Sequence, residues 1–221
     1  MRQTTIDGIA VRAGSEAVVI VSAQPLRILS SAVHCGGFAA ARAIVNLHVG
    51  KNDACADPPA MLTDYARRAG VPEPFVGLLT GAWTELAALG EEDGAGIPAL
   101  AVATVGLSNR IAAGRAPVTR WAPGTINTIV VVEAEPEPAA LVNAVMTVTE
   151  VKALLLQETG LRDAAGGLVS GTSTDAVVIA ATGRGARHSF GGPASPLGWS
   201  VARAAGKALQ AGIRGWQERN G

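Results

Sequence analysis

A polar turn that runs directly into a short apolar block constrains the fold of this chain more than any other feature. The turn is Gly171–Asp175, with the sequence GTSTD, and the block is Ala176–Ala181, with the sequence AVVIAA. The block is rich in β-branched residues and too short for a typical helix, so it predicts a buried strand. Asp175 would then begin the strand, directly after three hydroxyls on a turn that a glycine permits. Loops held by rigid elements often carry chemistry, but the same composition also suits a turn stabilised by its own side chains.

Size and composition favour a single compact globular unit. The chain has 221 residues, which is enough for a sizeable core, and we expect one domain over residues 1–221. Hydrophobic residues make up 48% and charged residues 16%, which excludes a disordered chain. We expect an α/β (or α+β) domain with a mixed sheet flanked by helices. The formal net charge of zero argues against a nucleic-acid partner, since phosphate binding requires a basic surface.

Cysteine usage and the amino terminus predict a cytoplasmic location. The two cysteines, Cys35 and Cys55, cannot form the disulfide framework of a small secreted domain, so we expect reduced thiols. The segment Met1–Asp7 lacks the pattern of a signal peptide, and we see no apolar run that predicts a membrane span. We therefore expect a soluble cytoplasmic protein with no membrane partner, and we leave a homo-oligomer open.

Alternating strand-like and helix-like segments predict the order of elements along the chain. Two strands, over 16–22 and 26–33, are expected to form a hairpin around Gln24-Pro25. Further strands are expected over 42–49, 76–80, 99–107, 125–132 and 176–181, with a helical or irregular piece between 80 and 99. Helices are expected from Pro58 to Arg68, from Pro138 to Thr159, and from the Ser195-Pro196 cap onward. The order of the strands in the sheet is left open.

A lysine within the apolar stripe of the helix from Pro138 to Thr159 is the most telling single residue. Lys152 shares this stripe with apolar residues at helical spacing, namely Leu141, Val145, Val148 and Leu155. An ammonium group there must be paired or must reach water with its tip. It could extend to solvent at the helix edge, or it could face a carboxylate such as Asp175. Glu150 lies about 200° around the helix, where it could be a metal ligand, a general base or a solvated side chain.

Five motifs in a fixed order resemble a known family. They are Ser30–Gly37 with Ile44–Asn46, Val105–Asn109 with Gly124–Asn127, Val148–Lys152, Gly171–Asp175, and Arg187–Ser189 in a glycine-rich loop. The set resembles the adenosylcobinamide amidohydrolase family over roughly residues 15 to 212. We expect the family to have glycine where this chain has Ser173, alanine where it has Val151, and a third glycine near Cys35. These departures remove no obvious reactive group.

The resemblance implies a particular reaction. Enzymes of this family remove the aminopropanol arm of adenosylcobinamide by hydrolysing an amide, which gives adenosylcobyric acid in corrinoid salvage. The corrinoid is then the substrate, and no bound cofactor is expected. Two alternatives stay open: a corrinoid-binding protein without turnover, and an amidohydrolase that acts on a different small amide.

Amide hydrolysis requires a nucleophile, donors for the tetrahedral oxyanion and a proton for the departing amine. The catalytic candidates are the hydroxyls and ionisable groups of these motifs, namely Thr172, Ser173, Thr174, Asp175, His188, Lys152 and Glu150. We expect His188 to act as base or acid, since imidazole titrates near neutral pH, although a loop histidine can equally bond to the backbone. We expect the turn to supply the nucleophile or the oxyanion donors. Whether a side chain or water attacks stays open.

Polar and aromatic residues near strand ends are the candidates for substrate binding. They are Asn46, Asn109, Asn127, Gly36, Gly37 and Trp121. The asparagines could bind the carboxamides around a corrin ring or could cap turns. Trp121 and Trp83 could pack against a corrin or adenine face, whereas Trp216 is expected to seal the last helix. We expect no metal, because the histidines and cysteines lack zinc-type spacing (His34, Cys35, His48, Cys55 and His188).

Overall fold

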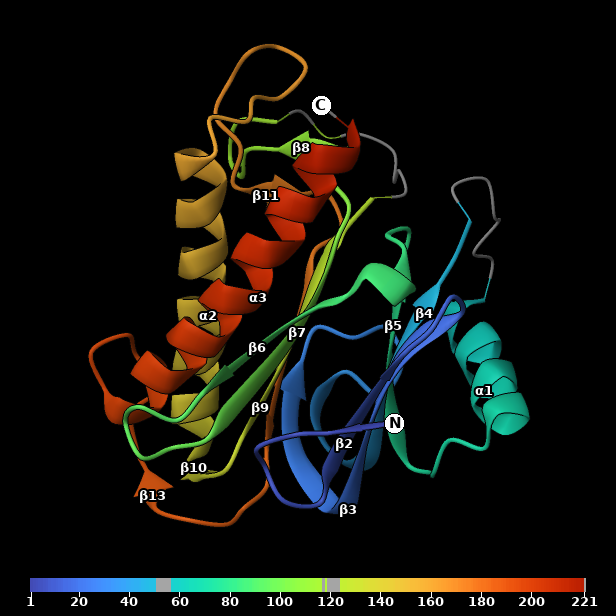
Figure 1. Ribbon diagram of the computed structural model, residues 1–221, viewed down its shortest axis with the longest axis vertical. Helices are drawn as coiled ribbons and strands as arrows, with labels where there is room; N and C mark the ends of the chain where they lie inside the picture. Colours follow the sequence, from blue (N-terminus) through green and yellow to red (C-terminus); the bar gives the residue numbers. More distant parts are fainter. Residues whose placement is uncertain (51–56, 117, 119–123, 221) are drawn as a thin grey trace.

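The computed structural model describes residues 1–50, 57–116, 118 and 124–220, so that Cys55 and Trp121 lie outside the described residues. The described chain forms one mixed α/β domain built on a curled, nine-stranded sheet with helices outside it (Figure 1). The predicted class, a mixed sheet flanked by helices, is confirmed.

The amino-terminal half of the chain forms one side of the curled sheet. Its elements are β1 (Arg2–Gln3), β2 (Ile9–Ala13), β3 (Ala17–Ser30), β4 (Gly37–His48), α1 (Pro58–Ala69) and β5 (Phe75–Thr80). Strand β3 pairs antiparallel with both β2 and β4, and β5 lies parallel to β4. The β-branched and aliphatic residues of these strands suit a covered, pleated surface.

The carboxyl-terminal half continues the same sheet. It consists of η1 (Thr84–Leu86), β6 (Ala88–Glu92), β7 (Ala99–Val105), β9 (Ile126–Val132), α2 (Pro138–Glu158), β12 (Ala176–Ala181) and α3 (Pro196–Asn220). From β3 outward, the strand order is β12, β9, β7 and β6. Strand β12 is antiparallel to β3 and parallel to β9, so it joins the two halves of the chain.

Two short strand pairs lie at opposite ends of α2 (Figure 1). At the upper end, β8 (Arg110–Ile111) pairs antiparallel with β11 (Gly171–Thr172). At the lower end, β10 (Glu135–Pro136) pairs parallel with β13 (Arg187–His188). This separation decides which of the predicted site residues can meet.

The apolar core forms three clusters: one between the sheet and helices α2 and α3, one between the two halves of the sheet, and one between the sheet and α1. The outer faces of β7, β9 and β12 pack against α2 and α3, as Val130, Ile179 and Val148 do. The inner faces of both halves of the sheet pack against each other, with Ile44 and Val102 among them. A third cluster joins the outer faces of β3 and β4 to α1. The order of layers is therefore two helices, sheet, sheet and one helix, and each strand places alternate side chains in different clusters.

Two predicted segments are wrong. The expected hairpin over 16–22 and 26–33 is the single strand β3, whose pairing with β4 shifts register between Val21 and Leu26. Pro25, which lacks an N–H donor, lies in this irregularity, so the strand bends without reversing. The piece between 80 and 99 is the short helix η1 followed by β6, which pairs with β7. The strands over 76–80, 99–107, 125–132 and 176–181 and the three helices are confirmed within a few residues.

Helix α2 is long and strongly apolar, although no apolar run in the sequence was expected to predict a membrane span. By length and composition it could cross a membrane, with a mean hydropathy of 1.6 over an 18-residue window of which 39% is buried. Its inner face packs against β12 and α3. Its outer face exposes Val142, Met146 and Leu154.

Candidate active site

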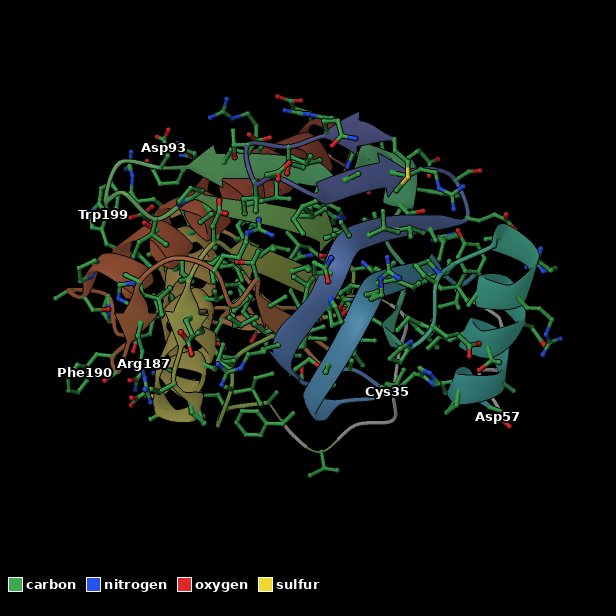
Figure 2. All side chains as sticks on the ribbon, turned by 90° about the horizontal axis from the view of Figure 1, so that it is seen from below. Cys35, Asp57, Asp93, Arg187, Phe190 and Trp199 are labelled. Atoms are coloured by element: carbon green, nitrogen blue, oxygen red, sulfur yellow. The ribbon has the colours of Figure 1, made fainter. Side chains whose placement is uncertain are left out.

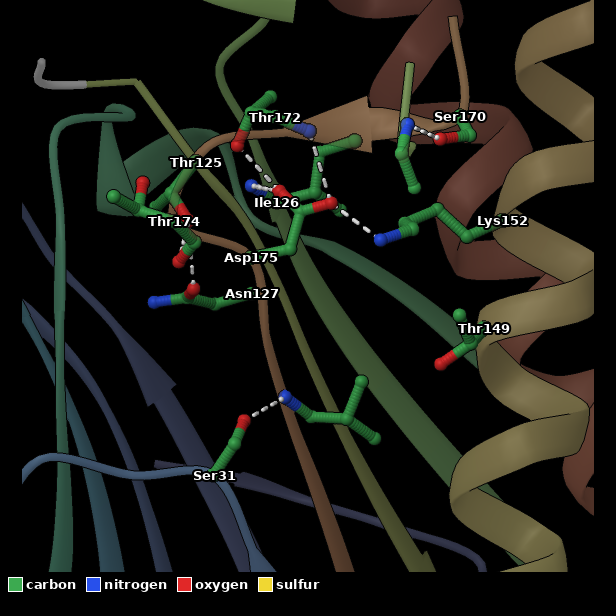
Figure 3. Close-up of polar contacts among 12 residues, drawn as sticks. Ser31, Thr125, Ile126, Asn127, Thr149, Lys152, Ser170, Thr172, Thr174 and Asp175 are labelled. Atoms are coloured by element: carbon green, nitrogen blue, oxygen red, sulfur yellow. Dashed lines mark hydrogen bonds and ion pairs between the residues drawn. The ribbon is translucent and has the colours of Figure 1, made fainter. Parts of the chain in front are cut away.

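The carboxylate of Asp175 is the centre of the polar cluster at the upper end of the sheet (Figure 3). Asp175 lies between β11 and β12, and its side chain turns back onto its own turn. Its Oδ1 accepts hydrogen bonds from Thr172 Oγ1 at 2.5 Å and from the backbone N–H of Ile126 at 3.0 Å. Its Oδ2 accepts from the Thr172 N–H at 3.1 Å and from Lys152 Nζ. These donors occupy the four acceptor positions of a carboxylate.

Lys152 reaches this carboxylate from α2. Of the two positions that the sequence left open for Lys152, the structure has the one that faces Asp175: the two side chains form an ion pair and are 9% and 11% exposed. The backbone of Gly171 passes directly beside the pair. A Cβ at this position would approach Asp175 Oδ2 to 2.3 Å and Lys152 Nζ to 2.9 Å, so the pair requires glycine there.

The three hydroxyls of the turn have different surroundings. Thr172 is buried and contacts Asp175, whereas Thr174 Oγ1 donates to the carbonyl of Gly124 at 3.0 Å. Ser173 is exposed at the tip of the turn, and its Oγ accepts a hydrogen bond of 2.8 Å from Asn109 Nδ2. Among the three, the hydroxyl of Thr172 therefore has the partner that a nucleophile needs, an acceptor for its proton within hydrogen-bonding reach.

The predicted asparagines divide into one at the turn and two behind it. Asn109 meets Ser173, while Asn46 and Asn127 are both 1% exposed. Asn127 Nδ2 donates to Asn46 Oδ1 at 2.8 Å and to the carbonyl of Leu79 at 2.8 Å. Asn46 Nδ2 in turn donates to Thr104 Oγ1 at 2.9 Å. These buried amides join the two sides of the curled sheet, a role that strand-end position alone did not reveal.

Thr125 connects the asparagine pair to the turn. Its hydroxyl lies 2.8 Å from the carbonyl of Thr174 and 3.1 Å from Asn127 Oδ1. The sequence analysis did not single out Thr125, although it lies within the quoted motif Gly124–Asn127. The feature that could have identified it in the sequence is a hydroxyl residue directly before a buried strand.

His188 lies far from the turn. It belongs to β13, which pairs with β10 at the lower end of α2, and its neighbour Arg187 lies beside α2 in the view from below (Figure 2). Strand β12 separates the two ends and spans six residues, which is about 20 Å. The structure therefore does not bring His188 to Asp175. Its Nε2 is buried and has no hydrogen-bond partner among the described residues.

Glu150 and the glycines of the β3–β4 connection also lie outside the cluster. Glu150 is exposed on α2, on the opposite side from Lys152, as the helical spacing predicts. A Cβ on Gly36 would lie 2.2 Å from the carbonyl of Ala32, and Gly37 has a φ of +79°. The backbone conformation therefore favours glycine at both positions, independently of any role in binding substrate. The connection begins near the site, because Ser31 Oγ accepts a hydrogen bond of 3.0 Å from Val177 N–H.

A cavity of about 230 Å³ adjoins the turn. Its polar and aromatic lining includes Trp83, Ser108, Gly124, Trp216, Arg219 and Asn220. The wall at Gly124 is shared with the turn, since the Gly124 carbonyl accepts the Thr174 hydroxyl bond. Trp216 packs partly against the core, as predicted, but it also lines this cavity. In the described part of the chain, no group of three or more His, Cys, Asp or Glu could hold a metal ion.

The fold and the cluster define an α/β protein with the polar groups of a hydrolase: a hydroxyl, a carboxylate and an ammonium in contact. The model of the adenosylcobinamide amidohydrolase family matches residues 2–221, and the chain belongs to this family. An adenosylcobinamide amidohydrolase from Methanosarcina mazei is 33% identical over 145 residues, which is 66% of this chain and 64% of that protein.

Two solved structures show a weak likeness to this chain. The PH0078 protein from Pyrococcus horikoshii OT3 is 14% identical, with a TM-score of 0.46 over 97% of this chain and 81% of that one. An L-aminopeptidase D-Ala-esterase/amidase from Ochrobactrum anthropi is 10% identical, with a TM-score of 0.40 over 94% and 83%.

Proposed function

We propose that this protein hydrolyses the amide that joins aminopropanol to the corrin ring of adenosylcobinamide, giving adenosylcobyric acid in corrinoid salvage. The observation that carries the proposal is the family match over residues 2–221. The corrinoid is the substrate and aminopropanol is the second product. The proposal places the reaction in the cytoplasm and requires no bound cofactor.

The proposed nucleophile is the hydroxyl of Thr172. Its Oγ attacks the amide carbonyl carbon while Asp175 Oδ1, at 2.5 Å, accepts its proton. Lys152 and the N–H of Ile126 hold the carboxylate in this orientation. The C–N bond then breaks, the proton passes to the amine nitrogen, and aminopropanol leaves. Water hydrolyses the resulting Thr172 ester and restores the hydroxyl.

Asn109 is the proposed donor to the developing oxyanion. Its Nδ2 points toward the tip of the turn, where it donates to Ser173 Oγ at 2.8 Å. A substrate carbonyl at the turn would take the place of Ser173 as acceptor. Side-chain amides in such positions stabilise tetrahedral intermediates. The hydroxyl of Ser173 is then not needed for the reaction, which agrees with the glycine that we expect at this position in the family.

The test is incubation of the purified, metal-stripped protein with adenosylcobinamide, followed by mass spectrometry of the products. We expect both adenosylcobyric acid and aminopropanol. Unchanged substrate, also after metals are added back, would contradict the proposal. Stoichiometric binding of the corrinoid without release of aminopropanol would indicate a binding protein, and turnover of other amides alone would indicate a different substrate.

A further inference from the structure

Trp83 is a large apolar side chain that is held in place without being buried. It is 60% exposed, and its ring stacks on His48 with a centroid distance of 5.0 Å and an interplanar angle of 21°. His48 is itself fixed by a 2.9 Å hydrogen bond from its Nδ1 to the carbonyl of Ala82. The hydroxyl of Thr84, next along the chain, donates to the carbonyl of Gly14 at 2.6 Å. The indole is therefore braced on one side and leaves its other side available to a ligand.

The cavity beside Trp83 has the lining that a flat heteroaromatic ring requires. The lining includes Trp83 and Leu86 at the two ends of the η1 segment, together with Trp216, Arg219 and Asn220 of the last turns of α3. Indole faces favour stacked rings, while guanidinium and amide groups can donate to ring nitrogens. The helix reaches the sheet closely here, since a Cβ on Gly212 would lie 2.7 Å from Val105 Cγ2.

The size and position of the cavity restrict what enters it. Its volume of about 230 Å³ is below the roughly 300–1,000 Å³ of a pocket for a whole drug-sized ligand, so it suits one planar base better than a whole corrin ring. Because Gly124 belongs to both the cavity wall and the hydrogen bonds of the turn, the cavity lies beside the proposed site of the amide.

We propose that this cavity binds the adenine ring of the substrate's adenosyl group, with Trp83 as the stacking surface. This inference rests on the proposed function, and it names the part of the substrate that the second site recognises. Aminopropanol is small and polar and would gain little from two indoles. Adenine offers both a flat face and ring nitrogens that accept hydrogen bonds from Arg219 and Asn220.

The test compares adenosylcobinamide with dicyanocobinamide, which has the same ring and arm but no adenosyl group. Stacking of a base on an aromatic side chain is worth roughly five- to a hundredfold in affinity. We expect Trp83→Ala to raise the KM and the Kd for adenosylcobinamide at least about fivefold and to leave those for dicyanocobinamide unchanged. Trp83→Phe, which keeps an aromatic face, is expected to recover most of the loss.

The matched control is Trp199→Ala. Trp199 is also exposed, at 39%, but it lies in the first turn of α3 near the loop that contains Asp93 (Figure 2). It is 17 residues, or about 25 Å of helix, from Trp216. We expect this control to affect neither corrinoid.

Titration calorimetry separates this inference from the proposed function, because binding does not require turnover. Tighter binding of the adenosyl form that depends on Trp83, in a protein without amidase activity, would support the cavity and contradict the proposed function. Amidase activity in which Trp83→Ala weakens both corrinoids equally, or neither, would overturn the cavity assignment and leave the proposed function intact.

Discussion

At the scale of single residues, the arrangement around Asp175 links the shape of the turn to its chemistry. Two of the four hydrogen bonds to the carboxylate come from Thr172, one from Ile126 at the start of β9, and one from Lys152 on α2. Three separate segments therefore depend on one side chain. The helical spacing predicted that Lys152 points inward, but the identity of its partner depended on where β12 begins in the sheet.

Replacement of the Thr172 hydroxyl tests the proposed nucleophile. We expect Thr172→Ala to lower kcat for adenosylcobinamide at least about a hundredfold, because the group that attacks is removed, and Thr172→Ser to retain measurable turnover. Circular dichroism would check that both variants fold. The control is Ser173→Gly, which we expect to retain activity. A Thr172→Ala variant with normal turnover would indicate that water or another hydroxyl attacks.

Removal of Lys152 tests the ion pair. Lys152→Met leaves the Asp175 carboxylate largely buried without its counter-ion, and we expect a loss of about 3–5 kcal/mol in the free energy of unfolding. Urea denaturation would measure it. The double variant Lys152→Met/Asp175→Asn, which removes both charges, is expected to recover part of the loss. Equal destabilisation in the single and double variants would speak against a charge effect.

The position of His188 reverses an expectation from the sequence. An imidazole in a glycine-rich loop suggested a base or acid, but the length of β12 separates His188 from the turn. We now expect His188→Ala to retain kcat within about twofold, since a general base must lie within hydrogen-bonding reach of the proton that it takes. Product formation under saturating adenosylcobinamide would measure this. A large loss of kcat in a folded His188→Ala protein would contradict the site at Thr172.

At the scale of elements, the carboxylate of Glu92 connects the end of β6 to α3. Hydrogen bonding from the backbone N–H of Gly94, together with Lys207 and the N–H of Asp93, lowers the pKa of Glu92 to about 2 against the opposing effect of burial. Glu92 also pairs with Arg203 and Lys207, at 3.4 and 3.2 Å. These ion pairs join β6, which pairs with β7 at the edge of the sheet, to α3.

The depressed pKa of Glu92 gives a pH dependence of stability. A carboxyl with a lowered folded-state pKa contributes stability above its ordinary pKa of 4.5, and this contribution is lost as the pH falls toward about 2. We expect Glu92→Gln to lower the Tm by about 2–4 °C at pH 7 and by much less near pH 2.5. Differential scanning calorimetry at both pH values would measure it. A Tm difference that does not depend on pH would contradict the assignment.

At the scale of the whole molecule, the curl of the sheet brings together residues that are far apart in the chain. Asn46 of β4 and Asn127 of β9 meet across the interior, although 81 positions separate them. Both amides are buried, and they find their hydrogen-bond partners within the protein: each other, the Leu79 carbonyl, and the hydroxyls of Thr104 and Thr125.

Asn127→Ala tests this connection between the two halves. It leaves the buried Asn46 oxygen and the Leu79 carbonyl without their donor, and we expect a loss of about 1–3 kcal/mol in the free energy of unfolding. The KM for adenosylcobinamide is expected to change little, because the pair lies behind the turn. Urea denaturation and steady-state kinetics on the same variant would separate the two effects. A large rise in KM with unchanged stability would instead place Asn127 in contact with the substrate.

The sequence by itself determined the features that depend on a few neighbouring residues. The apolar run after Asp175 specified a strand, helical spacing placed Lys152 and Glu150 on opposite sides of α2, and Ser195 began the last helix, where its Oγ accepts the Gly198 N–H at 3.1 Å. Propensity, periodicity and capping are local, so they can be inferred from one chain.

Only the tertiary structure decided which of these features meet. The bend within β3 and the position of β12 between β3 and β9 determine which residues lie at each end of the sheet. That order brings Thr172 and Lys152 together at one end and leaves His188 at the other. It also pairs Asn46 with Asn127 and forms the cavity at Trp83. Strand order depends on contacts between segments far apart in sequence, and no local pattern in a single chain specifies them.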